Sequence, residues 1–280
     1  MSLKKNGSPC ASPLIYLFIL AMFYTSCMKD VTINLPEYES KLVVESYLDS
    51  NVPFYIVSVT ESVSFFTPST FPVSQVLPVV NHAIVTITKG SKTDTLTFID
   101  SLQVYIKALQ SPMSDTDFEP YQLRVVDTAT NRIATATTQF LTKVPIDTVL
   151  YLLNDSLEAA MLLFFYDPKP DVNYYKVWFA NAANPYERDS LRTWEFSDKA
   201  LGDDRVSAGM GYRFRVNDTL IVRLYHINEE YFRFLDTVDD ADDAISSPFS
   251  RPSRIESNIQ GGTGIFVALT YDQRIVPIIQ

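Results

Sequence analysis

The sequence predicts a mainly β protein: two consecutive immunoglobulin-like β-sandwich domains, with one short helix in the second. Short runs rich in β-branched and aromatic residues alternate apolar with polar positions, which is the pattern of half-buried strands. Turn residues separate these runs at short intervals, as in antiparallel sandwiches. Apolar residues make up 46% of the 280 residues and charged residues 20%, so the chain can bury a sizeable core and is not of the disordered class.

The N-terminus has the features of a secretory signal. Lys4 and Lys5 give it a positive start, and residues 14–24 form an apolar run of 11 residues. A membrane-spanning helix needs roughly 20 apolar residues, so this run fits a signal peptide instead. Small residues then lead to Cys27, an order that resembles the bacterial lipoprotein signal. The alternative is an uncleaved hydrophobic N-terminus with an incidental cysteine.

In a lipoprotein signal the cysteine is linked to diacylglycerol, and cleavage makes it the new N-terminus. We therefore expect a signal peptide at 1–26 and a lipidated tether at 27–37. Residues 28–280 contain no further cysteine, so no disulfide is expected and Cys27 is explained as a lipid anchor. Acyl chains such as palmitate would hold the protein on a membrane, because each buried methylene contributes about 0.8 kcal/mol.

The first sandwich is expected at 38–145. Its strands are expected at 41–48, 55–60, 83–89, 94–99, 121–126 and 132–140. Residues 67–80 hold three prolines and are expected to form a long loop. Pro145 lies between two strand-like runs and marks the expected domain boundary.

The second sandwich is expected at 146–280. Its strands are expected at 147–153, 157–166, 173–180, 219–227 and 264–271. The segment 157–166 is almost wholly apolar and also fits a buried helix, but its length and the prolines after it favour a strand. A helix is expected near 228–238, because Asn228 is a good N-cap and apolar residues then recur on one helical face.

The candidate catalytic residues are sparse, and we do not expect an enzyme. His82 and His226 are the only histidines of the sequence, and no Gly-x-Ser-x-Gly motif occurs. A hydrolase that uses two carboxylates remains a remote alternative, because 33 acidic residues are available. No cofactor and no metal are expected.

Two motifs have a structural and a functional interpretation. Residues 261–264 (Gly-Gly-Thr-Gly) lack the lysine and the following helix of a phosphate loop, so they predict a structural turn. Residues 236–243 contain five aspartates, which fit a solvated helix end better than a weak divalent-cation site.

One strand carries the candidate ligand-binding residues. Tyr174, Lys176 and Trp178 share one face of 173–180. If the opposite face lies in the core, Tyr174 and Trp178 present flat aromatic surface for sugar rings or peptide side chains. The alternative is that they pack in a core or an interface. The net charge of −10 and the lack of a basic run make nucleic acid an unexpected partner.

Four segments together resemble a known family. They are the residues 33–45, Val144–Asp147, the Asp167-Pro168 pair with Asn173–Tyr175, and 247–266 with its Asn-Ile-Gln-Gly-Gly-Thr-Gly-Ile-Phe end. The chain is similar to the Bacteroidota lipoprotein family called domain of unknown function 4249. The resemblance implies an exported outer-membrane lipoprotein, cell-surface exposed and often encoded near a TonB-dependent transporter, with no established enzyme activity.

This resemblance and the signal together predict the function. We expect a non-catalytic, lipid-anchored outer-membrane protein that captures a ligand for a TonB-dependent receptor or assists that receptor in another way. The expected partners are the membrane, through acylated Cys27, and the receptor. The alternative is an adhesin or an envelope-structural lipoprotein in which the sandwiches act as spacers.

Overall fold

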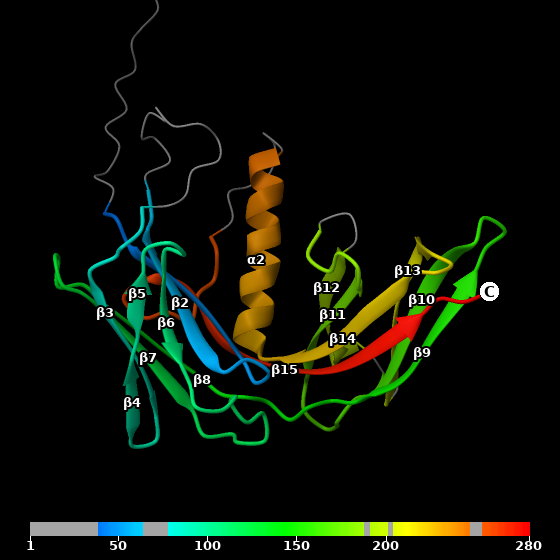
Figure 1. Ribbon diagram of the computed structural model, residues 1–280, viewed down its shortest axis with the longest axis horizontal. Helices are drawn as coiled ribbons and strands as arrows, with labels where there is room; N and C mark the ends of the chain where they lie inside the picture. The colour runs from blue at the N-terminus through cyan, green and yellow to red at the C-terminus, as the bar shows by residue number, and fades with distance from the viewer. Residues whose placement is uncertain (1–38, 64–77, 188–190, 201–203, 247–253) are drawn as a thin grey trace, which may run out of the picture. The chain divides into compact units, whose positions relative to one another are not determined.

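The computed structural model describes residues 39–63, 78–187, 191–200, 204–246 and 254–280 (Figure 1). Internal contacts divide the chain into Met1–Glu39 and Ser40–Gln280, and every element below belongs to the second unit. The expected signal peptide, the tether and Cys27 lie outside the described residues. Within those residues no helix is both long and apolar enough to cross a membrane.

The first sandwich is built from eight strands before residue 139. They are β1 (Leu42–Asp49), β2 (Phe54–Glu61), β3 (Ala83–Lys89), β4 (Lys92–Thr95), β5 (Thr97–Ile99), β6 (Val104–Ala108), β7 (Tyr121–Asp127) and β8 (Ile133–Thr138). One layer has the order β4-β3-β7-β8, and the other contains β1-β2-β6-β5. Alternate residues such as Val85, Ile87, Leu123 and Val125 are buried in the core between the layers, so their neighbours point to solvent.

The second sandwich follows the same principle. Its strands are β9 (Ile146–Leu153), β10 (Glu158–Tyr166), β11 (Tyr174–Asn181), β12 (Leu191–Ser197), β13 (Arg205–Arg215), β14 (Thr219–Ile227) and β15 (Thr263–Pro277), with a 3-10 turn at Asp198–Ala200. The layer β13-β10-β9 packs on the layer β12-β11-β14-β15. Strand β10 confirms the expected strand at 157–166: Met161, Leu163 and Phe165 on its inner face are fully buried.

The strand β15 belongs to both sandwiches. Its first half pairs in parallel with β1, from Val43 opposite Thr263 to Asp49 opposite Leu269. Its second half pairs antiparallel with β14, so one sheet of eight strands runs from the second sandwich into the first (Figure 1). A division of the chain at residue 145 therefore does not separate the two sandwiches completely.

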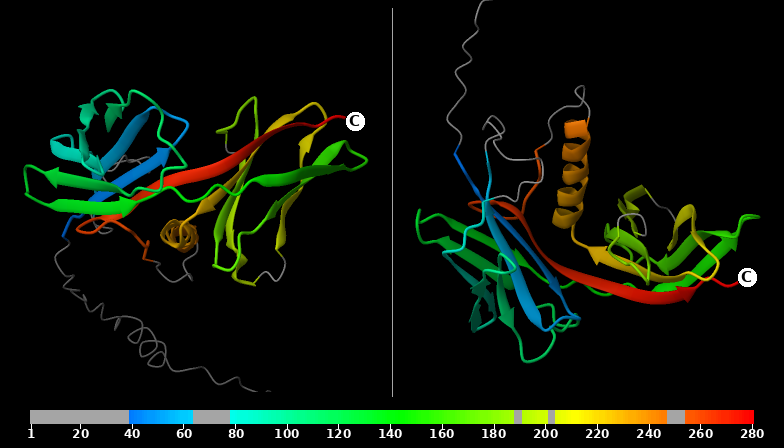
Figure 2. Two further views of the ribbon diagram at one scale, coloured as in Figure 1. Left: turned by 90° about the horizontal axis from the view of Figure 1, so that it is seen from below. Right: turned by 45° about the horizontal axis from the view of Figure 1, so that its top comes forward.

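The helix α2 (Glu229–Ser246) follows β14 directly and packs on β11, β12 and β15 (Figure 2). Asn228 caps it, since its Oδ1 accepts a hydrogen bond from Tyr231 N at 2.9 Å. Tyr231 and Phe234 are buried against Ile265 of β15 in a third apolar cluster. The helix runs beyond the expected end near residue 238. The mainly β fold class, with two sandwiches and a helix in the second, is confirmed.

Candidate functional site

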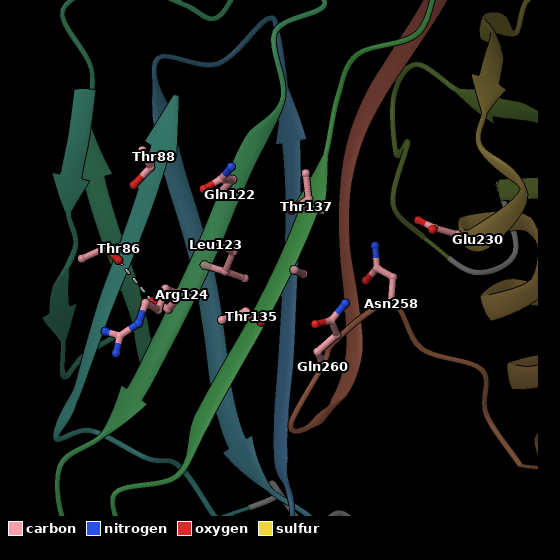
Figure 3. A pocket seen from close by; sticks show the side chains of 11 residues that line it. Thr86, Thr88, Gln122, Leu123, Arg124, Thr135, Thr137, Glu230, Asn258 and Gln260 are labelled. Carbon is pink, nitrogen blue, oxygen red and sulfur yellow. Dashed lines mark hydrogen bonds between the residues drawn. The ribbon is translucent and has the colours of Figure 1, made fainter. Parts of the chain in front are cut away.

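The outer face of the layer β4-β3-β7-β8 forms one wall of a hollow of about 340 Å³. We call it the polar hollow, and its polar lining residues are Thr86, Thr88, Gln122, Arg124, Thr135, Thr137, Glu230, Asn258 and Gln260. Figure 3 shows the threonines on β3 and β8, Gln122 and Arg124 on β7 between them, and Asn258, Gln260 and Glu230 on the other side. Hydroxyl and amide groups therefore make up most of the surface that a ligand would meet.

Strand register sets the order of these side chains. Thr88, Gln122 and Thr137 lie opposite one another in one cross-strand row. Thr86, Arg124 and Thr135 form the next row two positions along, because side chains on one face of a strand recur with period two. Threonine is stiff at χ1, so four of the six hydroxyl or polar positions are held with little loss of side-chain freedom.

A segment just before β15 supplies the second wall. Asn258 Nδ2 donates to Phe266 O at 2.8 Å, and its Oδ1 accepts from Phe266 N at 3.0 Å. Gln260 exchanges two backbone hydrogen bonds with Thr135, at 2.8 and 2.9 Å. The first two bonds attach the segment to β15 and the other two attach it to the edge strand β8, and the Gln260 side chain is left exposed in the hollow.

Glycines make this attachment sterically feasible, which agrees with the structural turn expected at 261–264. Gly261 has φ +78° and Gly264 has φ +116°, in a region that favours glycine. A Cβ on Gly262 would lie 2.7 Å from Leu42 O. The backbone of this turn is therefore in close contact with the neighbouring strands, where no side chain fits.

The lining charges are few. The Arg124 side chain is exposed and has no ion-pair partner among the residues that the structure describes, and Glu230 is exposed on the opposite wall. Gln122 is also exposed. The hollow therefore offers donors and acceptors in a fixed pattern, with one cation and one anion, and this composition suits a neutral ligand rich in hydroxyl or amide groups.

The face of β11 with Tyr174, Lys176 and Trp178 does not form the exposed aromatic surface that the sequence suggested. Trp178 is only 8% exposed, and the Tyr174 ring lies 5.0 Å from that of Phe232. Burial lowers the pKa of Lys176, whose Nζ lies 5.7 Å from the ring centre of Tyr231. The expectation is corrected because the apolar face of α2 needs a partner and covers these residues.

His226 is a satisfied side chain at the end of β14. Its Nδ1 lies 2.8 Å from Thr142 O and its Nε2 lies 3.1 Å from Asn173 Oδ1. Its ring also stacks on Tyr175, with the ring centres 5.6 Å apart. Each ring nitrogen thus has a partner in the protein.

Two buried carboxylates lie beside this histidine. Asp167 accepts hydrogen bonds from Tyr175 Oη at 2.5 Å and from Asn173 Nδ2 at 3.2 Å, while its Oδ2 lies 2.9 Å from Lys169 Nζ. Burial favours the neutral carboxyl, but hydrogen bonds from Tyr175 and Lys169 hold the pKa of Asp167 below its usual range. The Asp167 and Asp198 side chains are 0% and 3% exposed, so a substrate does not reach this pair.

His82 takes part in a similar network at the turn after β7. Asp127 is 1% exposed and lies 2.8 Å from His82 Nε2 and 2.7 Å from Arg132 Nη2. Burial alone would raise the pKa of Asp127, but hydrogen bonds from Thr130 and Arg132 hold it well below its usual range. Arg132 also pairs with Glu61, so the network connects the ends of three strands.

The aspartates of 236–243 lie on α2. Asp236, Asp239, Asp240 and Asp243 are exposed, and the side chain of Asp242 is outside the described part. In the described ranges no group of three or more His, Cys, Asp or Glu side chains is placed to hold a metal ion.

Sequence reasoning missed Gln122 and Arg124 as site residues. The signal was present, because they are the polar positions in an alternation with Leu123 and Val125. Alternation predicts that such residues point outward, but it does not show that β8 and the segment with Asn258 and Gln260 lie next to them.

Comparison with known proteins places the chain in a family. The model of the family described as domain of unknown function (DUF4249) matches residues 28–275. The chain belongs to this family. None of the curated proteins matches the DUF4249 chain.

Solved structures show only weak likeness to the DUF4249 chain. A two-domain fibronectin type-III segment from chicken tenascin has a TM-score of 0.24 and 9% identity, covering 85% of this chain and 99% of its own. A DUF3823 family protein from Bacteroides uniformis has a TM-score of 0.28 and 8% identity, covering 86% and 100%. A cytokine receptor complex has a TM-score of 0.27 and 11% identity, covering 67% and 92%.

Proposed function

We propose that this DUF4249 chain is an outer-membrane lipoprotein that captures a ligand in the polar hollow and acts as a non-catalytic accessory partner of a TonB-dependent transporter. The observation that carries the proposal is the polar hollow itself. Its rows of threonine, glutamine and arginine side chains have a fixed register, and Gln122 and Arg124 are exposed to a ligand.

The sequence supports the membrane part of the proposal. An apolar run of 11 residues followed by small residues and Cys27 is typical of a lipoprotein signal, and acyl chains on Cys27 would anchor the protein at the membrane surface. An anchored protein remains close to a transporter in the same membrane, which raises the local concentration of any ligand it releases there.

The chemistry of the hollow supports a neutral ligand with many hydroxyl groups, such as an oligosaccharide. A threonine hydroxyl donates one hydrogen bond and accepts others. Thr86 Oγ1 already donates to Arg124 O and Thr88 Oγ1 bonds Thr93 Oγ1, but each can still accept a bond from a polyhydroxyl ligand without a large charge. Hydrogen bonds that Arg124 donates to the ligand would contribute more to the binding free energy than those of the neutral side chains. A hydrogen bond with a charged donor contributes about 1.5–3 kcal/mol.

The binding test uses the full chain in mild detergent and a panel of neutral oligosaccharides on an array. We expect the double variant Gln122→Ala/Arg124→Ala to lose about tenfold or more in affinity for any sugar that binds. Arg213→Ala, which removes the same charge from an exposed position of β13, is the matched control and should keep the wild-type affinity. Equal binding by both variants would contradict ligand capture in the hollow.

The partner test isolates the native lipoprotein from gently solubilised outer membranes. Co-purification with a β-barrel receptor supports the accessory role, and recovery as a lone monomer counts against it. If deletion of the gene alters attachment or envelope integrity but leaves growth on nutrients unchanged, the adhesin or envelope-structural alternative replaces the proposal.

A further inference from the structure

A second pocket of about 420 Å³ lies between the turn after β1 and the strands β14 and β15. Arg223 of β14 and Tyr271 and Gln273 of β15 line it, together with Asn51, Asp115, Lys143 and Asp272. None of these residues belongs to the polar hollow. We call it the Arg223 pocket.

The guanidinium of Arg223 lies over two aromatic rings. Its Cζ lies 4.7 Å from the ring centre of Trp178 and 4.8 Å from that of Tyr271. Register produces this arrangement, because Trp178, Arg223 and Gln273 lie opposite one another on β11, β14 and β15, and Tyr271 is two positions from Gln273 on the same face. Contact with both rings restricts the guanidinium.

The guanidinium keeps donors for a ligand. Its Nε donates to Gln273 Oε1 at 2.8 Å, and its Nη1 donates to Tyr225 Oη at 3.2 Å. Both acceptors are neutral, and Nη2 has no hydrogen-bond partner among the described residues. Arg223 is only partly buried and lines the pocket, so a ligand can reach its remaining donors.

The other charges of the pocket are already paired. Lys143 Nζ lies 3.0 Å from Asp115 Oδ2. Asp272 lies 3.2 Å from Arg274 Nη1 and accepts a hydrogen bond from Ile146 N at 2.9 Å. Arg223 has no carboxylate within ion-pair distance in the described part of the chain, so its charge is the one in the pocket left without a counter-ion.

We propose that the Arg223 pocket binds the carboxylate group of a small organic ligand, with Arg223 as the residue that recognises it. A guanidinium is planar and presents parallel N–H donors that match the two oxygens of a carboxylate. A single negative charge fits better than a phosphate dianion, because Asp115 and Asp272 lie in the same lining and repel added negative charge. Asn51 and Gln273 supply amide groups for the rest of the ligand.

This proposal does not rest on ligand capture in the polar hollow. The two sites share no lining residue, so a ligand for one is not required by the other. The Arg124→Gln variant removes an arginine from the hollow alone and therefore serves as a charge-matched control for Arg223→Gln.

The test is an NMR titration of the full chain in detergent micelles, labelled with 15N-arginine. Three probes are added separately: N-acetylglycine, its uncharged analogue N-acetylglycinamide, and inorganic phosphate. We expect N-acetylglycine to shift the Nε–H signal of Arg223 in a saturable way, and the amide and phosphate to bind at least about tenfold more weakly. Arg223→Gln should weaken N-acetylglycine binding by about tenfold or more, while Arg124→Gln binds as the wild type does.

Several results would overturn the proposal. They are an unshifted Arg223 signal, equal binding of the amide, or tighter binding of phosphate than of N-acetylglycine. If Arg223→Gln fails to fold because Trp178 loses its partner, the binding of the three probes to the wild type still shows whether the pocket prefers a carboxylate. Arg223→Lys then gives a second variant, which keeps the charge but not the planar donors and should bind more weakly than the wild type.

Discussion

Replacement of Gly264 by alanine tests whether the attachment of β15 to β1 depends on a glycine. Gly264 has φ +116°, and a Cβ built there would collide with the carbonyl oxygen of Val44 and lie 2.9 and 3.0 Å from Val44 C and N. These are backbone atoms of β1, the strand that pairs with this part of β15. The collision is relieved only if the two strands move apart.

The expected cost has two parts. A residue with a side chain at this φ is strained by about 1–3 kcal/mol. Forcing a methyl group into a fully packed site costs about 1–3 kcal/mol more. We therefore expect Gly264→Ala to lower the free energy of unfolding by about 3 kcal/mol or more, and to weaken the hollow, because the Asn258 side chain in its wall is hydrogen-bonded to Phe266 of β15.

Gly211→Ala is the matched control. Gly211 lies in β13, and a Cβ there would meet no atom within 4 Å. The substitution Gly211→Ala should change the free energy of unfolding of the protein by less than about 1 kcal/mol. Urea unfolding of the full chain, followed by circular dichroism and tryptophan fluorescence, measures both variants. If the two stabilities differ by less than about 1 kcal/mol, the reasoning about β15 is refuted.

Three further predictions follow from buried or terminal residues. Asp127→Asn leaves Arg132 without its buried carboxylate and should destabilise the protein by about 3 kcal/mol at pH 7. Because the folded pKa of Asp127 is lowered, this stability is present above the unfolded pKa near 4 and is lost as the pH falls below it, so the variant's unfolding should depend less on pH in acid melts. Trp178→Ala should cost about 3 kcal/mol or more in urea unfolding, whereas Tyr186→Ala, at an 82% exposed position, should change stability by about 0.5 kcal/mol or less. Cys27→Ser should release the protein from the membrane fraction, and retention there on fractionation would contradict the lipid anchor.

Periodicity predicted most of the strands because local alternation determines them. The segment at 83–89 is a strand with the same bounds, and 219–227 likewise. The single strand expected at 94–99 is two strands, β4 and β5, which lie in different layers. Leu96 lies between them, is 5% exposed, and donates a backbone hydrogen bond to Val85 O. The chain therefore changes layer at a buried apolar residue, which the sequence does not distinguish from a residue inside a strand.

The strands β12 and β13 were not expected. Arginine, glutamate and glycine occur in them, and these residues weaken a pattern based on β-propensity. β12 pairs with β11 and β13 pairs with β10, and these backbone hydrogen bonds form strands that the local sequence does not predict. The length of α2 was missed for a related reason, since aspartate is a poor helix former and the apolar stripe fades after Val238.

Sequence analysis could not identify the candidate sites, because each site is formed by segments that are distant in the sequence. The sequence analysis proposed Trp178 as a ligand-binding surface, but its indole ring contacts Arg223 and is buried in the apolar cluster with α2. Alternation alone could not tell a face that a helix covers from one that stays open, since both carry the same mixture of polar and aromatic residues.

Both proposed sites depend on the C-terminal segment, but on different parts of it. Asn258 and Gln260, next to the glycine turn, form a wall of the polar hollow, while Tyr271 and Gln273 in the second half of β15 form a side of the Arg223 pocket. The first half is held by β1 and the second half by β14. Loss of the pairing at Gly264 should therefore impair the hollow more than the pocket, so a Gly264→Ala variant that still binds N-acetylglycine but no oligosaccharide would show that the two sites work independently.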